Sequence, residues 1–111
     1  MNYRSIDSMF AVAGQLQPSE VIEIAEAGFK TIVCARPDYE DPGQPTFGEI
    51  ASKAAALGLQ AVHIPISGGV TDGAVSRMAR AMREMPKPMF GYCRSGNRAG
   101  NLYSAAIGDS Q

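Results

Sequence analysis

The sequence holds few side chains that could bind a metal or build a disulfide framework. Its 111 residues include one histidine and two cysteines. His63, Cys34 and Cys93 lack the short spacings of metal-ligand motifs, so we predict no metal site and no other cofactor. Two cysteines are also too few for the disulfide framework of a small secreted domain. We therefore interpret Cys34 as a core residue and Cys93 as a reactive thiol.

An excess of one charge is also missing. The chain has 10 basic and 11 acidic residues, a formal net charge of -1 and no basic block, which argues against nucleic acid as a partner. No apolar run approaches the roughly 18 residues that a membrane span needs. Residues 1–10 include Arg4 and Asp7 where a signal peptide would be apolar. We expect a cytoplasmic protein with no nucleic-acid or membrane partner.

What the sequence does contain is an alternation of short apolar strands and amphipathic helices, separated by glycine and proline. The patterns predict strands over 10–15, 29–35, 59–66 and 89–92, and helices over 18–27, 46–57, 71–85 and 98–107. Such alternation implies parallel pairing with right-handed crossovers. We predict a single small α/β domain over residues 1–111, with a mostly parallel four-stranded sheet flanked by helices on both faces.

In sheets of this kind, ligands bind beyond the carboxyl ends of the strands. This rule places three loops, 35–45, 66–72 and 93–98, at one rim of the domain. The last of them is typical of an anion-binding loop built around a thiolate. A short strand delivers Cys93 into a turn of small residues closed by Arg98, where a helix begins. The backbone N–H groups of such a turn and the helix N-terminus stabilise an anion, so we predict a nucleophilic sulfur at Cys93.

The loop has C-x4-R spacing, which resembles the CxxGxR loop of the rhodanese sulfurtransferases and is one residue shorter than the C-x5-R loop of cysteine-dependent phosphatases. Over nearly the whole chain, the sequence is similar to the bacterial phosphatase-like domain family named for its fusion to β-lactamase-like hydrolases. The segments that carry this resemblance are 12–16, 35–38, 42–45, 63–66 and 92–96. It implies a cysteine-phosphatase-like fold. It also implies that Cys93 is the nucleophile, that Arg94, Ser95, Gly96 and Asn97 bind the substrate, and that Arg98 is a bidentate clamp.

The sequence departs from the phosphatases of this fold in two places. They usually carry a histidine before the nucleophile, where this chain has Tyr92, and often an aspartate general acid after a Pro-Ile pair, where this chain has Ser67-Gly68-Gly69. The nearest following acid is Asp72, which could instead complement the dipole of its helix. Asp38 is a candidate proton donor and Arg36 a candidate substrate contact at the rim, although both could serve loop structure.

Four other polar residues have simpler interpretations. We interpret Glu40 and Asp41 as solvated loop charges, and His63 as a side chain that satisfies a core or loop hydrogen bond. Cys34 is a core residue or, since its strand neighbours the strand of Cys93, a resolving thiol.

Loop length favours one function among three. A shorter loop offers fewer N–H groups, which suits a terminal sulfur better than a phosphoryl group with three oxygens. We therefore predict a sulfurtransferase that forms a Cys93 persulfide from thiosulfate or a persulfide donor and passes the sulfur to a thiol acceptor, such as a protein thiol. The alternatives are a phosphatase that hydrolyses phosphomonoesters of the phosphotyrosine type through a phosphocysteine, and a non-catalytic module that binds an anion or a partner protein.

Overall fold

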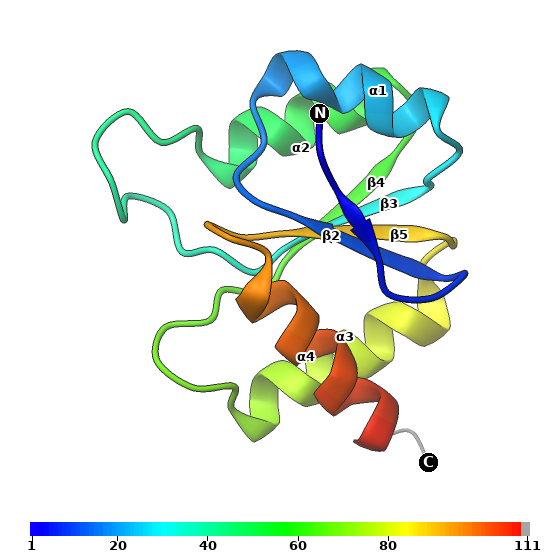
Figure 1. Cartoon of the computed structure of the whole chain (residues 1–111), viewed down its shortest axis with the longest axis vertical. Coiled ribbons are helices and arrows are strands. Elements are labelled where there is room, and N and C mark those ends of the chain that lie inside the picture. Colours follow the sequence, from blue (N-terminus) through cyan, green and yellow to red (C-terminus); the bar gives the residue numbers. More distant parts are fainter. Residues whose placement is uncertain (110–111) are drawn as a thin grey trace.

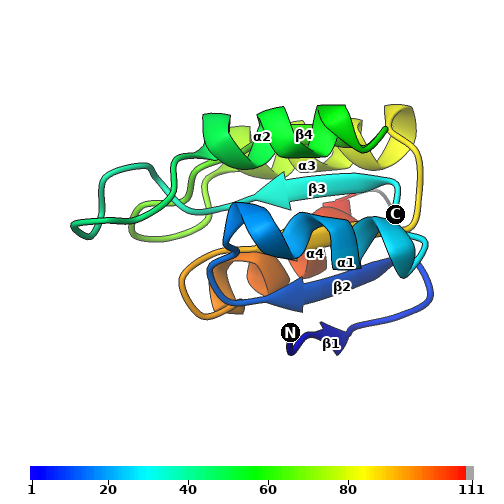
Figure 2. The same ribbon diagram turned by 90° about the horizontal axis from the view of Figure 1, so that it is seen from above.

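Five strands form one sheet, in the order β1-β2-β5-β3-β4, in the computed structural model, which describes residues 1–109. The strands are β1 (Arg4–Ser5), β2 (Phe10–Ala13), β3 (Thr31–Cys34), β4 (Gln60–His63) and β5 (Met89–Tyr92). The last four pair in parallel, with β5 between β2 and β3. The arrows of β2 and β3 point the same way in Figure 2, so the loops that follow them leave from one side of the domain.

The four parallel strands confirm the predicted order of elements, but the prediction of four strands in total was wrong. The additional strand, β1, pairs antiparallel with β2, with Arg4 opposite Val12. It has only two residues and both are exposed, so it carries no alternation of apolar and polar residues. At the edge of the sheet it extends the pairing of β2 (Figure 2).

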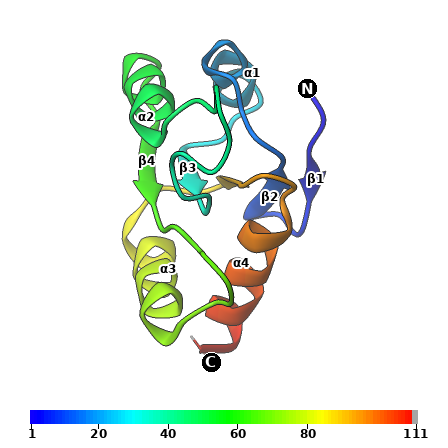
Figure 3. The ribbon, with the colours of Figure 1, turned by 90° about the vertical axis from the view of Figure 1, so that its left-hand side faces the viewer.

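Helices cover both faces of the sheet, as predicted. A short 3-10 helix, η1 (Pro18–Glu20), leads into α1 (Val21–Glu26), and these lie with α2 (Phe47–Ala56) on one face; α3 (Asp72–Glu84) and α4 (Asn97–Asp109) lie on the other (Figure 3). The hydroxyls of Thr46 and Thr71 accept hydrogen bonds from backbone N–H groups three residues later, which fixes where α2 and α3 begin. None of these helices, within residues 1–109, has the length and apolarity to cross a membrane.

The core is divided by the sheet into two apolar clusters. Successive strand residues face opposite sides, so Val33 packs in the cluster beneath α3 and α4, whereas Ile32 and Cys34 pack in the cluster beneath α1 and α2. Cys93 belongs to the first cluster and Tyr92 to the second. The strand pleat therefore turns the two cysteines toward opposite faces of the sheet.

Candidate functional site

Loops from three parallel strands meet at one rim of the domain, as the sequence predicts. The segment after β3, the segment after β4 and the turn after β5 all project from the carboxyl ends of their strands (Figure 1). Hydrogen bonds join them. The Arg98 guanidinium donates to the Ile66 carbonyl oxygen at 2.9 Å and to the Glu40 carboxylate. Residues from separate parts of the sequence thus surround the Cys93 loop.

Cys93 lies at the base of this loop and is fully buried. Its N–H donates to the Ala13 carbonyl oxygen of β2 at 3.4 Å, which ties the start of the loop to the sheet. The Gly96 N–H donates to the Cys93 sulfur at 3.1 Å, so the chain curls back over the thiol. Helix α4 begins at Asn97, whose N–H donates to the Ser95 hydroxyl. The backbone of the loop can thus stabilise negative charge on the sulfur.

Two glycines allow the loop to adopt this path. Gly96 has φ +98°, a left-handed conformation that side chains disfavour, and a Cβ there would lie 3.3 Å from the Ala13 carbonyl oxygen. Gly14 passes so close beneath the loop that a Cβ would lie 3.0 Å from the Arg94 carbonyl oxygen. The loop is therefore packed directly against the end of β2.

We expect Gly96→Ala to destabilise the domain by about 1–2 kcal/mol, the usual cost of placing a side chain in the left-handed region. The strain also displaces the N–H that binds the sulfur and loosens the loop over the buried thiol, so the rate of Cys93 alkylation by iodoacetamide should change. Gly100→Ala is the matched control, because Gly100 lies in α4 with open space where a Cβ would stand. The two measurements are thermal unfolding and alkylation rate. Unchanged values of both in Gly96→Ala would contradict this account of the loop.

Arg98 is held in a bidentate ion pair rather than left free at the rim. Its Nη1 donates to Glu40 Oε2 at 2.7 Å and its Nη2 to Glu40 Oε1 at 2.9 Å. Hydrogen bonds from Arg98 and Arg36 lower the pKa of the Glu40 carboxyl to about 2. Glu40 in turn raises the pKa of Arg98, with a smaller contribution from the Cys93 sulfur, with which the guanidinium interacts. Glu40 is an exposed loop charge, as interpreted from the sequence, but its carboxylate also pairs with two arginines, which the sequence does not predict.

Arg36 organises the loop that carries Glu40. The side chain is buried, and its guanidinium donates to Glu40 at 2.9 Å, to Asp41 at 2.7 Å and to Gln15 Oε1 at 2.9 Å. These contacts compensate the buried positive charge, so Arg36 stabilises the structure of the loop in this arrangement. Asp41, interpreted from the sequence as a solvated charge, has a side chain that is 42% exposed but also pairs with this buried cation.

The remaining rim candidates are spread around the loop. Asp38 accepts a hydrogen bond from the Phe47 N–H at 2.8 Å and thereby fixes the start of α2, which fits its structural alternative. Asp72 is exposed at the first position of α3. Arg94 is 68% exposed and lies 3.4 Å from Asp41, so its charge faces solvent beside the loop. Ser95 and Asn97 are exposed as well.

Cys34 and Tyr92 pack on the opposite face of the sheet from Cys93. Burial raises the pKa of the Cys34 thiol, which donates to the Arg36 carbonyl oxygen at 3.4 Å. Burial likewise raises the pKa of Tyr92, whose hydroxyl interacts with Cys34 but has no hydrogen-bond partner of standard geometry within residues 1–109. The His63 Nε2 forms a hydrogen bond of 2.8 Å with the Arg36 carbonyl oxygen, as its interpretation as a loop-stabilising side chain expects.

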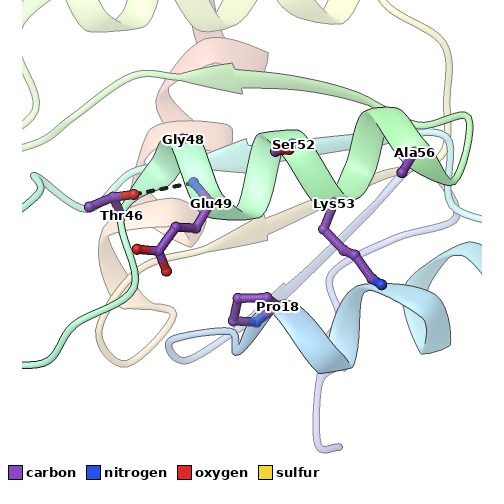
Figure 4. Close-up of a pocket in the computed structure, with 7 residues that line it drawn as sticks. All are labelled: Pro18, Thr46, Gly48, Glu49, Ser52, Lys53 and Ala56. Carbon is purple, nitrogen blue, oxygen red and sulfur yellow. Dashed lines mark hydrogen bonds between the residues drawn. The ribbon is translucent and has the colours of Figure 1, made fainter.

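A groove of about 670 Å³ lies away from the loop, between η1 and α2. Figure 4 shows Pro18 on one wall and Glu49, Ser52 and Lys53 on the other. None of the candidate site residues lines it. Within residues 1–109, no group of three or more histidine, cysteine, aspartate or glutamate side chains is placed to hold a metal ion.

Comparison with known proteins identifies the family of this chain. Residues 2–110 match the model of the β-lactamase hydrolase-like protein, phosphatase-like domain. The chain belongs to this family. A β-lactamase hydrolase-like protein of Agrobacterium fabrum is 36% identical over 99 residues, which are 88% of this chain and 23% of that protein. A protein of the same description from Xylella fastidiosa is 34% identical over 107 residues, 94% of this chain and 24% of that protein. The chain thus spans about a quarter of the length of these curated relatives.

Solved structures place this phosphatase-like domain among cysteine-phosphatase-like folds. A candidate phosphatase from Neisseria meningitidis Z2491 superposes with a TM-score of 0.82 at 28% identity, covering 90% of this chain and 72% of that one. The core catalytic domain of the PP-IP phosphatase SIW14 from S. cerevisiae has a TM-score of 0.65 at 17% identity, covering 92% of this chain and 62% of that one. At that identity the likeness shows the fold alone. The predicted fold class and family resemblance are confirmed, and the phosphatase alternative gains more support than sulfur transfer.

Proposed function

We propose that this phosphatase-like domain uses the Cys93 thiolate to attack the phosphoryl group of a small phosphate ester or anhydride. The observation that carries the proposal is a buried cysteine whose sulfur accepts the Gly96 N–H, in a loop closed by Arg98, on a fold whose neighbours include a candidate phosphatase. Backbone N–H groups and a planar guanidinium are the donors that stabilise a phosphoryl group in transfer.

The proposed reaction has two steps. The thiolate attacks phosphorus, a P–S bond forms and the P–O bond to the leaving group breaks, so the oxygen departs with the electron pair. Water then attacks phosphorus, a new P–O bond forms and the P–S bond breaks, so phosphate is released with the Cys93 thiolate regenerated and a proton passing to solvent. Arg98 binds oxygens of the phosphoryl group throughout.

No carboxyl group among the rim candidates is arranged to protonate the leaving group. Glu40 is ionised between two arginines, Asp38 accepts the Phe47 N–H, and Asp41 pairs with Arg36. Asp72 has an exposed side chain at the start of α3. We infer that the leaving group departs as an anion, which favours esters of acidic phenols and phosphoanhydrides over alkyl esters.

A series of aryl phosphates tests this expectation. We expect kcat/KM to fall steeply as the pKa of the leaving phenol rises, because each leaving group carries its full negative charge away. Asp72→Asn is the control variant and should leave the slope unchanged. A shallow slope in the wild-type domain that becomes steep in Asp72→Asn would identify Asp72 as a general acid and contradict the unassisted departure.

Sulfur transfer remains the second candidate, and the short C-x4-R loop with its N–H at 3.1 Å from the Cys93 sulfur favours it. In that reaction the thiolate attacks the outer sulfur of thiosulfate, the donor S–S bond breaks and sulfite leaves. An acceptor thiolate, on a small molecule or a protein, then takes the outer sulfur from the Cys93 persulfide and restores the thiolate. Assay of sulfite release from thiosulfate in the presence of a thiol tests it.

A further inference from the structure

We propose that Glu40 is a positioning residue that holds one edge of the Arg98 guanidinium so that its other edge is presented to the anion above Cys93. The inference rests on the proposed function, because it assumes that the Cys93 loop binds a tetrahedral dianion. It assigns a role in anion recognition to a residue that lies 58 positions from Arg98 in the sequence.

The first argument is a count of hydrogen-bond donors. A guanidinium has five N–H bonds, two on each Nη and one on Nε. Nη1 uses both of its bonds, one to Glu40 Oε2 and one to the Ile66 carbonyl oxygen, and Nη2 uses one of its two for Glu40 Oε1. The two that remain, on Nε and Nη2, lie side by side on one edge. That edge matches two oxygens of a phosphate-like anion.

The second argument is that Glu40 is itself held in place. Its Oε1 also accepts a hydrogen bond from the Arg36 Nε at 2.9 Å. Arg36 is 3% exposed and is anchored in turn by Gln15 and Asp41. A carboxylate fixed by a buried cation can orient a second cation, whereas a freely rotating surface glutamate cannot.

The third argument is the backbone before Glu40. Tyr39 has φ +64°, a left-handed conformation that a residue with a side chain adopts only at a cost in free energy. Its side chain is 84% exposed, so no burial of the ring compensates for that cost. The residue that follows, Glu40, binds both Arg36 and Arg98. The segment after β3 lies over the same rim as the turn after β5 (Figures 1 and 3).

Binding of tungstate, a tetrahedral dianion, tests the inference without requiring turnover. Its dissociation constant is measured by titration calorimetry for the wild-type domain, Glu40→Gln, Arg98→Lys and the double variant, with folding checked by circular dichroism. We expect Glu40→Gln to weaken binding by about tenfold or more in the Arg98 background, and by less than about twofold in the Arg98→Lys background, since a lysine has no second edge to present.

Glu84→Gln is the control, because Glu84 also accepts a hydrogen bond from an arginine, Arg80, at 2.8 Å, but this exposed pair on α3 includes neither Arg36 nor Arg98. We expect it not to weaken tungstate binding. If Glu40→Gln fails to fold, Glu40→Asp takes its place with the same expected direction, since the shorter side chain cannot reach both arginines at their present positions.

Four results overturn the inference. Tighter tungstate binding by Glu40→Gln would show that the carboxylate competes with the anion for Arg98. Equal weakening in the Arg98 and Arg98→Lys backgrounds would show a general disturbance of the loop. A wild-type domain that does not bind tungstate would refute the proposed function together with this inference, whereas wild-type binding that Glu40→Gln leaves unchanged would refute the inference alone.

Discussion

Replacing Cys93 by serine should reduce turnover by about 10³-fold or more while the domain stays folded, because a serine hydroxyl ionises far less readily than a thiol and is a much weaker nucleophile in this loop. The substitution keeps nearly the same volume, so the buried cluster beneath α3 and α4 should tolerate it. Turnover of 4-nitrophenyl phosphate and thermal unfolding measure the two effects.

Cys34→Ser is the matched control for this experiment. Cys34 faces the other side of the sheet, and a serine there can still donate to the Arg36 carbonyl oxygen. It should retain activity within about threefold of wild type, as expected of substitutions away from the reacting atoms. Comparable losses from the two serine variants would show that Cys93 matters for packing and would remove it as the nucleophile.

Arg98→Lys should lower kcat/KM by about 10²-fold or more even though the positive charge is kept. Arg98 binds both carboxylate oxygens of Glu40 and the Ile66 carbonyl oxygen at once, and a lysine ammonium with three donors at one point cannot make these contacts together. Steady-state kinetics with an aryl phosphate measure the loss.

Arg94→Lys is the control that distinguishes the effect of positive charge from the effect of guanidinium geometry. Arg94 lies in the same loop but is exposed, and its contact with Asp41 at 3.4 Å is an ion pair at the surface. Arg94→Lys should therefore change kcat/KM by less than about threefold. A loss in Arg94→Lys as large as that in Arg98→Lys would mean that the planar fork of Arg98 has no special role.

The order of strands and helices could be predicted because local features mark their ends. Gly28 and Gly58 have positive φ after α1 and α2, and threonine caps begin α2 and α3. The alternation of strands and helices then predicted parallel pairing, which places the loops after the strands at one rim of the domain. Strand β1 could not be predicted, since two exposed residues form it only by pairing with β2.

The Cys93 loop could be located from its spacing, but its surroundings could not. Glu40 binds Arg98 across 58 positions, and nothing near Glu40 in the sequence distinguishes it from a solvated acid. Such a pair depends on how β3 and β5 bring their loops together. The sequence could not decide between phosphoryl and sulfur transfer either. The length of the Cys93 loop indicates that an anion binds there, but it does not identify the anion.

The most direct test of the proposed chemistry is the adduct on Cys93. The domain is mixed with an aryl phosphate or, separately, with thiosulfate, quenched rapidly, and the peptide that contains Cys93 is examined by mass spectrometry, with Cys93→Ser as the control. We predict a phosphocysteine at Cys93 that is absent from the control. A persulfide at Cys93 after thiosulfate, with no phosphocysteine from any aryl phosphate, would contradict phosphoryl transfer and favour sulfur transfer; neither adduct would favour a non-catalytic binding module.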